Sequence, residues 1–296
     1  GFLRQAMESA LQQSYPNVEV IVSDNCSTDD TEQLVESLAT PRLRYIRQSR
    51  NIGPNNNFNY CLEQARGDYF LLLSDDDLID TDMVESCMNA AGNDTGLGLI
   101  RVGTRLIDGE GKTTWQVPNP MQGLSAADLF LAWFSNKTSF YLCSTLYNTE
   151  YLRAAGGFSS PHNLFQDVVA TAKLAGGYDR VDVTEVKASF RQHGPSYGSA
   201  AKISAWSEDS RYLLDVICEV IPEKKERLRS EGMRYFCEKN YMYTSRLGSP
   251  VRHLDTYLMV YRKFDYVYSP FHYIYSKIYK PRLIGKMQGL RRVLGF

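Results

Sequence analysis

The sequence predicts an α/β fold with a mixed, mostly parallel sheet flanked by helices and a helical appendage at the C-terminal end. Two observations carry this prediction. Over the first 95 residues, short apolar β-branched runs alternate with segments of helical period, as in parallel strands joined by helical crossovers. From about residue 199 onward the pattern is helical and rich in tyrosine. A chain of 296 residues has room for one large α/β domain and such an appendage.

The elements of the first part follow from local signals. Apolar, β-branched runs predict strands at 17–24, 43–46 and 69–74. Helical periodicity predicts helices at 29–39, 55–66 and 81–91, of which the last two end at glycines. The chain opens in a helical pattern from Leu3, and an α/β domain rarely starts without a strand. We therefore expect an upstream strand to be lacking here.

After residue 95 the regular alternation of strands and helices ends. Apolar runs at 97–106 and 113–117 flank an Asp-Gly-Glu-Gly turn and predict an antiparallel hairpin. The remaining elements expected are helices at 125–134, 148–155 and 164–175 and a strand at 179–190. A Gly-Pro-Ser sequence at 194–196 marks the expected domain boundary, which gives domains at 1–195 and 196–296.

Composition excludes several classes of protein. The chain is 43% hydrophobic and 23% charged with a net charge of −1, which argues against nucleic-acid binding. Six widely spaced cysteines without a CxxC pair predict reduced thiols in the cytoplasm and no zinc site. No apolar stretch approaches the roughly 20 residues of a membrane span.

Acidic side chains follow two expected strands at the edge where ligands bind in an open α/β sheet. Asp24 ends the first strand, and Asp75, Asp76 and Asp77 follow the third. Adjacent acids repel one another unless a cation or hydrogen-bond donors compensate them. Mg²⁺ and Mn²⁺ take carboxylate oxygens and bridge to phosphates. The alternative for the triplet is an exposed turn in which Asp77 or Thr81 caps the next helix.

Several motifs in succession resemble the family 2 glycosyltransferases with the GT-A fold, of the bacterial polysaccharide and cell-envelope type. The stretch from Asp24 to Thr31 is similar to their DDxSxDxT sequence. Asn51-Ile52-Gly53, then Ala65-Arg66-Gly67-Asp68-Tyr69, then Ser74 to Asp77 match the NxG, AxG[DE]Y and DxD motifs in order and spacing. The resemblance covers roughly residues 1–195 and implies the GT-A fold.

The resemblance implies a nucleotide diphosphate sugar as donor, with UDP first and GDP or dTDP as further possibilities. Asp24 is able to accept a hydrogen bond from the N3 imide that uracil and thymine present. Asn25 is expected to shape the turn, and Asn51 and Gly53 to let the backbone pass close to the nucleotide. Asp75 is placed to bind the ribose hydroxyls.

The resemblance places Mn²⁺ or Mg²⁺ on Asp76, with Asp77 orienting the ion through water. The common family pattern is D-x-D-D, whereas this chain has Ser74 in the first position, so Asp75 and Asp77 both remain possible as the second functional acid. His193 lies at a strand end where related enzymes have Y-R-x-H. It is expected either to ligate the metal or to serve as a hydrogen-bonded structural residue.

An inverting transfer also needs a base opposite the leaving group. The family carries an acid after a Gly-Gly-Phe-type loop, commonly in the pair Glu-Asp. Here Gly156-Gly157-Phe158 is followed by Gln166 and Asp167. Asp167 is therefore the expected general base, and the alternative is a cap of the helix that it begins.

The segment 266–296 contains no acid and interleaves basic residues with aromatic ones, which suits the surface of an anionic bilayer. The alternative is a packed helical appendage with solvated charges. We therefore expect a cytoplasmic protein with peripheral contact to the inner face of the cell membrane.

Taken together, the sequence predicts a metal-dependent, inverting glycosyltransferase acting on a hydroxyl of a glycan or lipid-linked glycan. Two alternatives remain open: a catalytically inactive nucleotide-sugar-binding or assembly protein, and a sugar nucleotidyltransferase. The second would need a glycine-rich loop bearing Arg or Lys near the N-terminus, and this sequence shows none.

Overall fold

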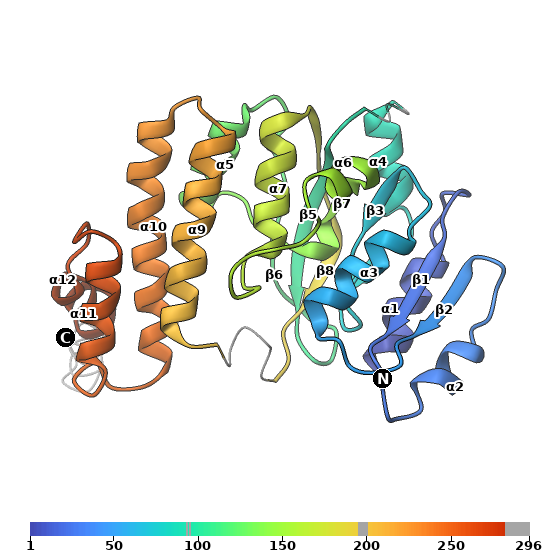
Figure 1. Cartoon of the computed structure of the whole chain (residues 1–296), viewed down its shortest axis with the longest axis horizontal. Helices are drawn as coiled ribbons and strands as arrows, with labels where there is room; N and C mark the ends of the chain where they lie inside the picture. Colours follow the sequence, from blue (N-terminus) through green and yellow to red (C-terminus); the bar gives the residue numbers. More distant parts are fainter. Residues whose placement is uncertain (93, 95, 195–200, 282–296) are drawn as a thin grey trace, which may run out of the picture.

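The computed structural model describes residues 1–296 except 93, 95, 195–200 and 282–296. A sheet lies in the middle with helices on its faces, and a further group of helices lies along one flank (Figure 1). The N-terminal part comprises α1 (Phe2–Leu11), β1 (Val20–Asp24), α2 (Thr31–Glu36), β2 (Leu43–Arg47), α3 (Pro54–Gln64), β3 (Tyr69–Leu71), β4 (Leu78–Ile79) and α4 (Met83–Ala91).

The middle part contains the long strands of the sheet. It comprises β5 (Leu99–Ile107), β6 (Thr113–Val117), α5 (Ala126–Phe134), a 3-10 turn (Leu142–Ser144), β7 (Thr145–Asn148), α6 (Thr149–Ala154), α7 (Gln166–Gly177) and β8 (Arg180–Arg191). The predicted hairpin is confirmed, because β5 and β6 pair antiparallel across a turn in which the Gly111 amide donates to the Asp108 carbonyl.

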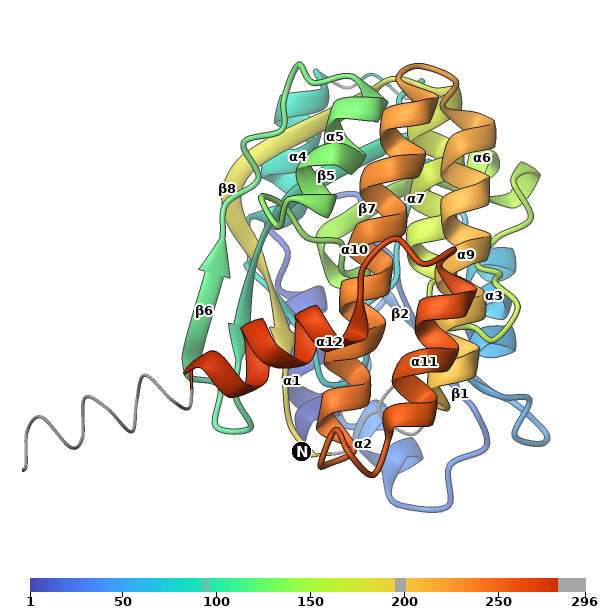
Figure 2. The same cartoon turned by 90° about the vertical axis from the view of Figure 1, so that its left-hand side faces the viewer.

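The C-terminal part is helical, as expected. It comprises α9 (Ile203–Val220), α10 (Lys225–Arg246), α11 (Leu254–Lys263), α12 (Pro270–Tyr273) and a π-helical turn (Ile274–Tyr279). Figure 2 shows α11 and α12 on the outer side of α10. The boundary expected near 194–200 falls largely outside the described residues.

The strand pairing confirms a mixed sheet, but the pairs are mostly antiparallel, whereas a mostly parallel sheet was expected. β1 pairs parallel with β2 as a separate two-stranded sheet, and β5 pairs parallel with β8. The remaining pairs of described strands, β3–β7, β4–β8, β5–β6 and β5–β7, are antiparallel. The expected strand at 69–74 ends at Leu71, and its partner β7 is only four residues long.

One apolar core joins the sheet to the C-terminal helices. Phe134 of α5 lies 5.8 Å (ring centroids) from Phe236 of α10, and both belong to a cluster that also includes residues of α7 and α9. The α9–α10 pair therefore lies rigidly against α7, whose N-terminal end carries the expected base. This packing places α9 and α10 beside the candidate site.

Candidate active site

Asp24 ends β1 as a buried carboxylate with three polar partners. Its Oδ1 accepts the Ser27 amide at 2.7 Å, and its Oδ2 accepts the Tyr45 hydroxyl at 2.7 Å. Arg47 Nε lies 3.5 Å from Oδ2. Burial alone would raise the pKa of Asp24, but these hydrogen bonds and the Arg47 charge hold it below its ordinary value. A carboxylate has about four acceptor positions, so one remains for a ligand N–H.

The loop after β1 and the loop before α3, both expected at the nucleotide, are joined by hydrogen bonds of their asparagine side chains. Asn25 Nδ2 donates to Asn51 Oδ1 at 2.9 Å, and Asn25 Oδ1 accepts the Ile52 amide at 2.8 Å. Asn51 Oδ1 also accepts the Gly53 amide. Gly53 has φ of 84°, a conformation that favours glycine, and it precedes Pro54 at the first position of α3. Asn25, Asn51 and Gly53 thus form one rigid surface.

The three consecutive acids have separate environments. Asp75 is exposed, whereas Asp76 is partly buried and its Oδ2 lies 2.9 Å from His193 Nε2. Asp77 is 1% exposed and points elsewhere: its Oδ1 accepts the Arg191 amide at 2.9 Å. Burial raises the pKa of Asp77 to about 7. Asp77 therefore fastens the end of β8, and the alternative of a helix cap is wrong, since Asp82 holds the N-cap position of α4.

Asp76 and His193 remain as the candidate metal pair. The described residues contain no group of three or more His, Cys, Asp or Glu side chains arranged to hold a metal ion. A carboxylate and an imidazole nevertheless fit Mn²⁺ or Mg²⁺, because such ions commonly take one or two protein ligands and complete their shell with substrate phosphates and water. The Phe2 ring, 4.5 Å from the imidazole, holds His193 in place.

Arg191 connects several segments of this region through its side chain. Its Nε donates to the Asp76 carbonyl at 2.7 Å, and its Nη2 donates to Gln5 Oε1 at 2.7 Å. Its guanidinium also covers the Phe2 ring at 4.5 Å. Arg191 thereby connects α1, the acid segment and the end of β8. Its partners come from parts of the sequence more than 80 residues away, which no local motif reveals.

Asp167 occupies the second position of α7, so it is not the helix cap, a position held by Phe165. Burial raises the pKa of its carboxyl to about 6, although the side chain keeps some access to solvent. The Asp167 carbonyl accepts the Thr171 hydroxyl at 2.9 Å and the Tyr147 hydroxyl at 3.4 Å. A carboxylate with this pKa is mostly ionised at neutral pH and still basic enough to take a proton.

The Gly156-Gly157-Phe158 loop lies against α3. Gly157 has φ of 66°, and a β-carbon there would clash with Asn59. The Asn59 side chain accepts the Phe158 amide at 2.8 Å and donates to its carbonyl at 2.9 Å. Asn55 donates to the same carbonyl. The glycines therefore allow a close approach between this loop and the helix that follows the Asn51–Gly53 loop.

Asp209 of α9 holds the next stretch of chain and was missed by sequence reasoning. Its buried carboxylate accepts the Ser160 hydroxyl at 2.6 Å, the His162 amide at 2.8 Å and the Leu164 amide at 2.9 Å. The segment it holds leads directly into α7 and Asp167. Asp209 lies more than 40 residues further along the chain in an ordinary helical pattern, so only the fold reveals this contact.

These groups face one end of the molecule. The end of β1, the end of β8 and the first turns of α7 and α9 are the lower ends of these elements in Figure 1. Asp24 with the two asparagines, Asp76 with His193, and Asp167 are therefore three clusters on the same side. Among the described residues, the hydrogen bonds of these side chains join members of one cluster and do not link one cluster to another.

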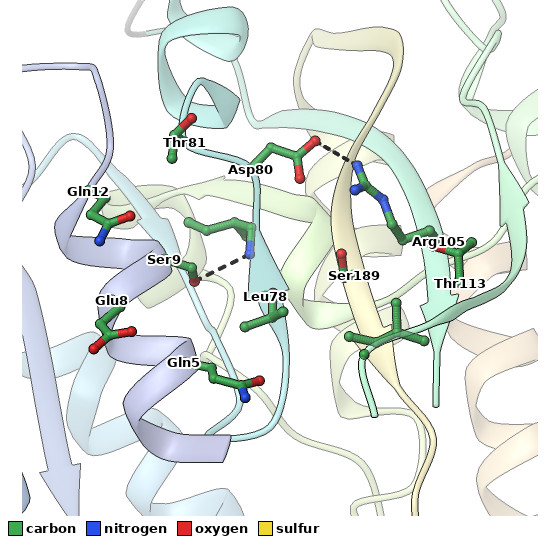
Figure 3. A pocket seen from close by; sticks show the side chains of 13 residues that line it. Gln5, Glu8, Ser9, Gln12, Leu78, Asp80, Thr81, Arg105, Thr113 and Ser189 are labelled. Carbon is green, nitrogen blue, oxygen red and sulfur yellow. Dashed lines mark hydrogen bonds and ion pairs between the residues drawn. The ribbon is translucent and has the colours of Figure 1, made fainter. Parts of the chain in front are cut away.

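A separate hollow of about 380 Å³ lies between α1, β4 and the β5–β6 hairpin (Figure 3). Arg105 Nη2 lies 2.6 Å from Asp80 Oδ2 beside it. The hollow contains none of Asp24, Asp76 and Asp167. It is therefore distinct from the candidate active site.

Comparison with known proteins gives consistent results. The family model described as "Glycosyl transferase family 2" matches residues 1–155. The chain is 34% identical to chondroitin synthase of Escherichia coli over 112 residues, which is 37% of this chain and 16% of that protein. It is 35% identical to the GalNAc(5)-diNAcBac-PP-undecaprenol beta-1,3-glucosyltransferase of Campylobacter jejuni over 113 residues, 37% of this chain and 35% of the relative.

The chain spans less than half the length of the curated relatives that it matches. Among solved structures, S. aureus TarS with UDP-GlcNAc superposes with a TM-score of 0.66 at 16% identity, covering 90% of this chain and 77% of TarS. The mannosyltransferase PcManGT of Pyrobaculum calidifontis with GDP-Man and Mn²⁺ gives 0.51 at 17% identity, covering 90% and 81%. These similarities confirm the fold expected from the sequence.

Proposed function

Because this chain belongs to glycosyl transferase family 2, we propose that it transfers a sugar from a nucleotide diphosphate sugar to a hydroxyl of a glycan or lipid-linked glycan. The transfer would proceed with inversion and depend on a divalent cation. The observation that carries this proposal is the arrangement of three polar clusters, around Asp24, Asp76 and Asp167, on one side of the molecule. The catalytic unit would be residues 1–195, with the C-terminal helices supporting it.

The donor side is formed by the first loops. Asp24 would accept an N–H of the base, and Asn25, Asn51 and Gly53 would form the surface against which the nucleotide lies. Exposed Asp75 would bind the ribose hydroxyls. The two structural neighbours were solved in complex with UDP-GlcNAc and GDP-Man, which are both nucleotide diphosphate sugars, and this supports the donor class.

Asp76 and His193 would hold Mn²⁺ or Mg²⁺ together with donor phosphates. When bound, such an ion offsets the charge that develops on the departing diphosphate, an effect worth several kcal/mol. Asp77 would hold the end of β8, and thereby His193, in position. Mn²⁺ in the PcManGT complex supports this choice of metal.

Asp167 would act as general base. In its ionised form it would accept the proton of the acceptor hydroxyl as the hydroxyl oxygen forms its bond to the anomeric carbon and the diphosphate leaves with the electron pair of the broken bond. Its pKa of about 6 suits this role. The hydrogen bonds of Tyr147 and Thr171 to the Asp167 carbonyl would fix the helix turn from which the carboxylate projects.

We further propose a cytoplasmic protein that contacts the inner face of the membrane through the segment 266–296. No helix within the described ranges is long and apolar enough to cross a membrane. Phe271, Tyr275 and Tyr279, at four-residue spacing, are 63%, 59% and 41% exposed and form an outward aromatic stripe. Such a stripe beside basic residues favours the interface of an anionic bilayer.

The test is an assay with UDP-, GDP- and dTDP-sugars, Mn²⁺ and a panel of glycan acceptors. We expect release of nucleoside diphosphate and transfer to an acceptor, and loss of both in Asp76→Asn. Asp167→Asn should keep donor binding but lose about 10²–10⁴-fold in transfer rate. Full transfer activity in both variants would refute the mechanism. Donor binding without turnover would favour an inactive binder, and pyrophosphate release would favour a nucleotidyltransferase.

A further inference from the structure

Helix α10 presents four side chains on one face toward the candidate site. Tyr235, Lys239, Tyr243 and Arg246 follow one another at spacings of four, four and three residues, which brings them onto one helix face. The first three are half-buried and Arg246 is exposed. Lys239 Nζ lies 5.2 Å from the Tyr235 ring centroid, and Arg246 Cζ lies 5.5 Å from that of Tyr243. We name these four residues the α10 face.

The two cations of the α10 face lack ion-pair partners among the residues that the structure describes. Glu238, the nearest acid in sequence, instead pairs with Lys277 at 2.9 Å. Burial lowers the pKa of Lys239; the charge of neighbouring Glu238 opposes this shift and that of Arg246 adds to it. Solvation accounts for exposed Arg246, but it does not account for a half-buried lysine beside a like charge. An anion bound between them would offset both effects.

Tyr235 and Tyr243 contact these cations through their rings, and Tyr141 lies near both tyrosines. Tyr141, stacked on Phe190 at 4.6 Å, faces Tyr235 and Tyr243 closely enough for each phenol to affect the ionisation of another. Within the described part of the chain, none of the three hydroxyls has a hydrogen-bond partner. Hydroxyl groups in such a partly buried position favour a polar ligand such as a sugar, which satisfies them.

The α10 face lies between the acid segment and the expected base. Tyr141 stacks on Phe190, the residue before Arg191, whose amide donates to Asp77. On the other side, Tyr243 lies 4.7 Å from Trp206, and Trp206 lies 5.3 Å from Phe165, two residues before Asp167. A sugar seated on this face would therefore lie beside both the donor phosphates and the base.

We propose that the α10 face and Tyr141 form an acceptor subsite for a sugar unit that bears a carboxylate or a phosphate. Lys239 and Arg246 would bind the anion, and the three tyrosines would contact the ring and its hydroxyls. The proposal rests on the proposed glycosyl transfer and deepens it, because it assigns the acceptor to the class of anionic glycans.

The test uses three probes that share one ring and differ only at C6: methyl glucoside, methyl glucuronide and methyl glucoside 6-phosphate. Their dissociation constants for the whole chain are measured by saturation-transfer NMR at low salt. For the wild type we expect at least one charged probe to bind about tenfold more tightly than the neutral one, because charge-assisted hydrogen bonds are roughly twice as strong as neutral ones. The preferred anion then separates a uronate from a phosphorylated sugar.

A double variant, Lys239→Gln with Arg246→Gln, should bind all three probes equally. Arg227→Gln, which removes an exposed cation of the same helix that pairs with Glu231 at 2.7 Å, should keep the preference. Far-UV circular dichroism checks that each variant is folded. Equal binding of charged and neutral probes by the wild type, binding of neither anion, or a preference that survives in the double variant would each overturn the proposal.

The same samples separate this proposal from the proposed function. Thermal unfolding with UDP or GDP and Mn²⁺ measures binding of the donor nucleotide. The binding of the sugar probes is measured without any nucleotide. Wild type and the double variant should show the same nucleotide response. A preference for anions without any nucleotide response would leave the subsite standing and remove the glycosyl transfer.

Discussion

Burial and hydrogen bonding together decide how readily an acid in the site ionises. Asp24, Asp76, Asp77 and Asp167 are chemically identical, yet hydrogen bonds lower the pKa of Asp24 while burial raises the pKa of Asp167 to about 6 and that of Asp77 to about 7. The role of each residue therefore follows from its neighbours more than from its position in a motif.

The rate of transfer should depend on pH through Asp167. The carboxylate must be ionised to accept a proton, so kcat/KM should rise with pH and level off above its pKa of about 6. Asp215→Asn, which changes an exposed acid of α9 paired with Arg229, is the matched control and should keep this profile. A profile that shows no change between pH 5 and pH 7 would exclude Asp167 as the base.

Candidate site residues could be proposed from the sequence, but their hydrogen-bond partners could not. Motif spacing predicted site roles for Asp24, Asp76 and Asp167, because each belongs to a short pattern beside a strand or loop. The burial of Asp77 against the Arg191 amide depends on a contact across 114 residues. Tyr45, which donates to Asp24, belongs to the neighbouring strand and to no motif.

Among the elements, those with a strong local pattern were predicted, whereas the strands β4 and β7 were missed. The hairpin and the helices of the C-terminal part have clear turns and periods. β4 has two residues and β7 has four, which is too short for a period-2 pattern to show. Since β7 is the partner of β3, missing it also hid the antiparallel pairing of the strand before the acids.

The contact between α9 and the loop before α7 should affect acceptor binding. Asp209→Asn keeps the shape of the side chain but removes the charge that three donors share, each worth about 1.5–3 kcal/mol when the acceptor is charged. We expect a lower urea midpoint and a higher KM for the acceptor with an unchanged KM for the donor. Equal increases in both KM values would indicate a general structural defect. Ser160→Ala, which removes one donor, should show the same split to a smaller degree.

A buried ion pair joins β5 to β8. Arg101 Nη1 lies 3.1 Å from Asp182 Oδ1, and both side chains are 1% exposed. Removing one partner leaves a buried charge alone, so Asp182→Asn should lower the free energy of unfolding by about 3–5 kcal/mol. The double variant Arg101→Met with Asp182→Leu should be less destabilised than the single one. Denaturant unfolding measures both, and a loss below about 1 kcal/mol for Asp182→Asn would contradict this assignment.

At the scale of the whole molecule, we expect the C-terminal helices to support the site and to contact a membrane. Flotation with vesicles of anionic lipid should carry the wild-type chain, and Phe271→Ser with Tyr275→Ser should reduce the bound fraction. Neutral vesicles should bind less, because the segment 266–296 is basic. The idea is wrong if the variant floats as well as the wild type. The matched control is Tyr212→Ser, which replaces another exposed tyrosine, on α9.

The overall class of the protein was predictable, whereas the association of its two parts was not. Alternating strands and helices indicate an α/β domain from local patterns alone. The packing of α10 against α5 through Phe134 and Phe236 depends on side chains about 100 residues apart. The acceptor subsite proposed on α10 therefore becomes visible only in the folded chain.

Thermal unfolding with UDP, GDP and dTDP, each with and without Mn²⁺, tests most directly whether the Asp24 and Asp76 clusters share one nucleotide and one cation. For one of the nucleotides, Mn²⁺ should raise the midpoint by about 5 °C at a hundred times the dissociation constant, since a ligand that binds the folded state stabilises it by mass action. Asp76→Asn should abolish the Mn²⁺-dependent part of this shift. An unchanged midpoint with every nucleotide, or an equal shift in Asp76→Asn, would contradict a shared site.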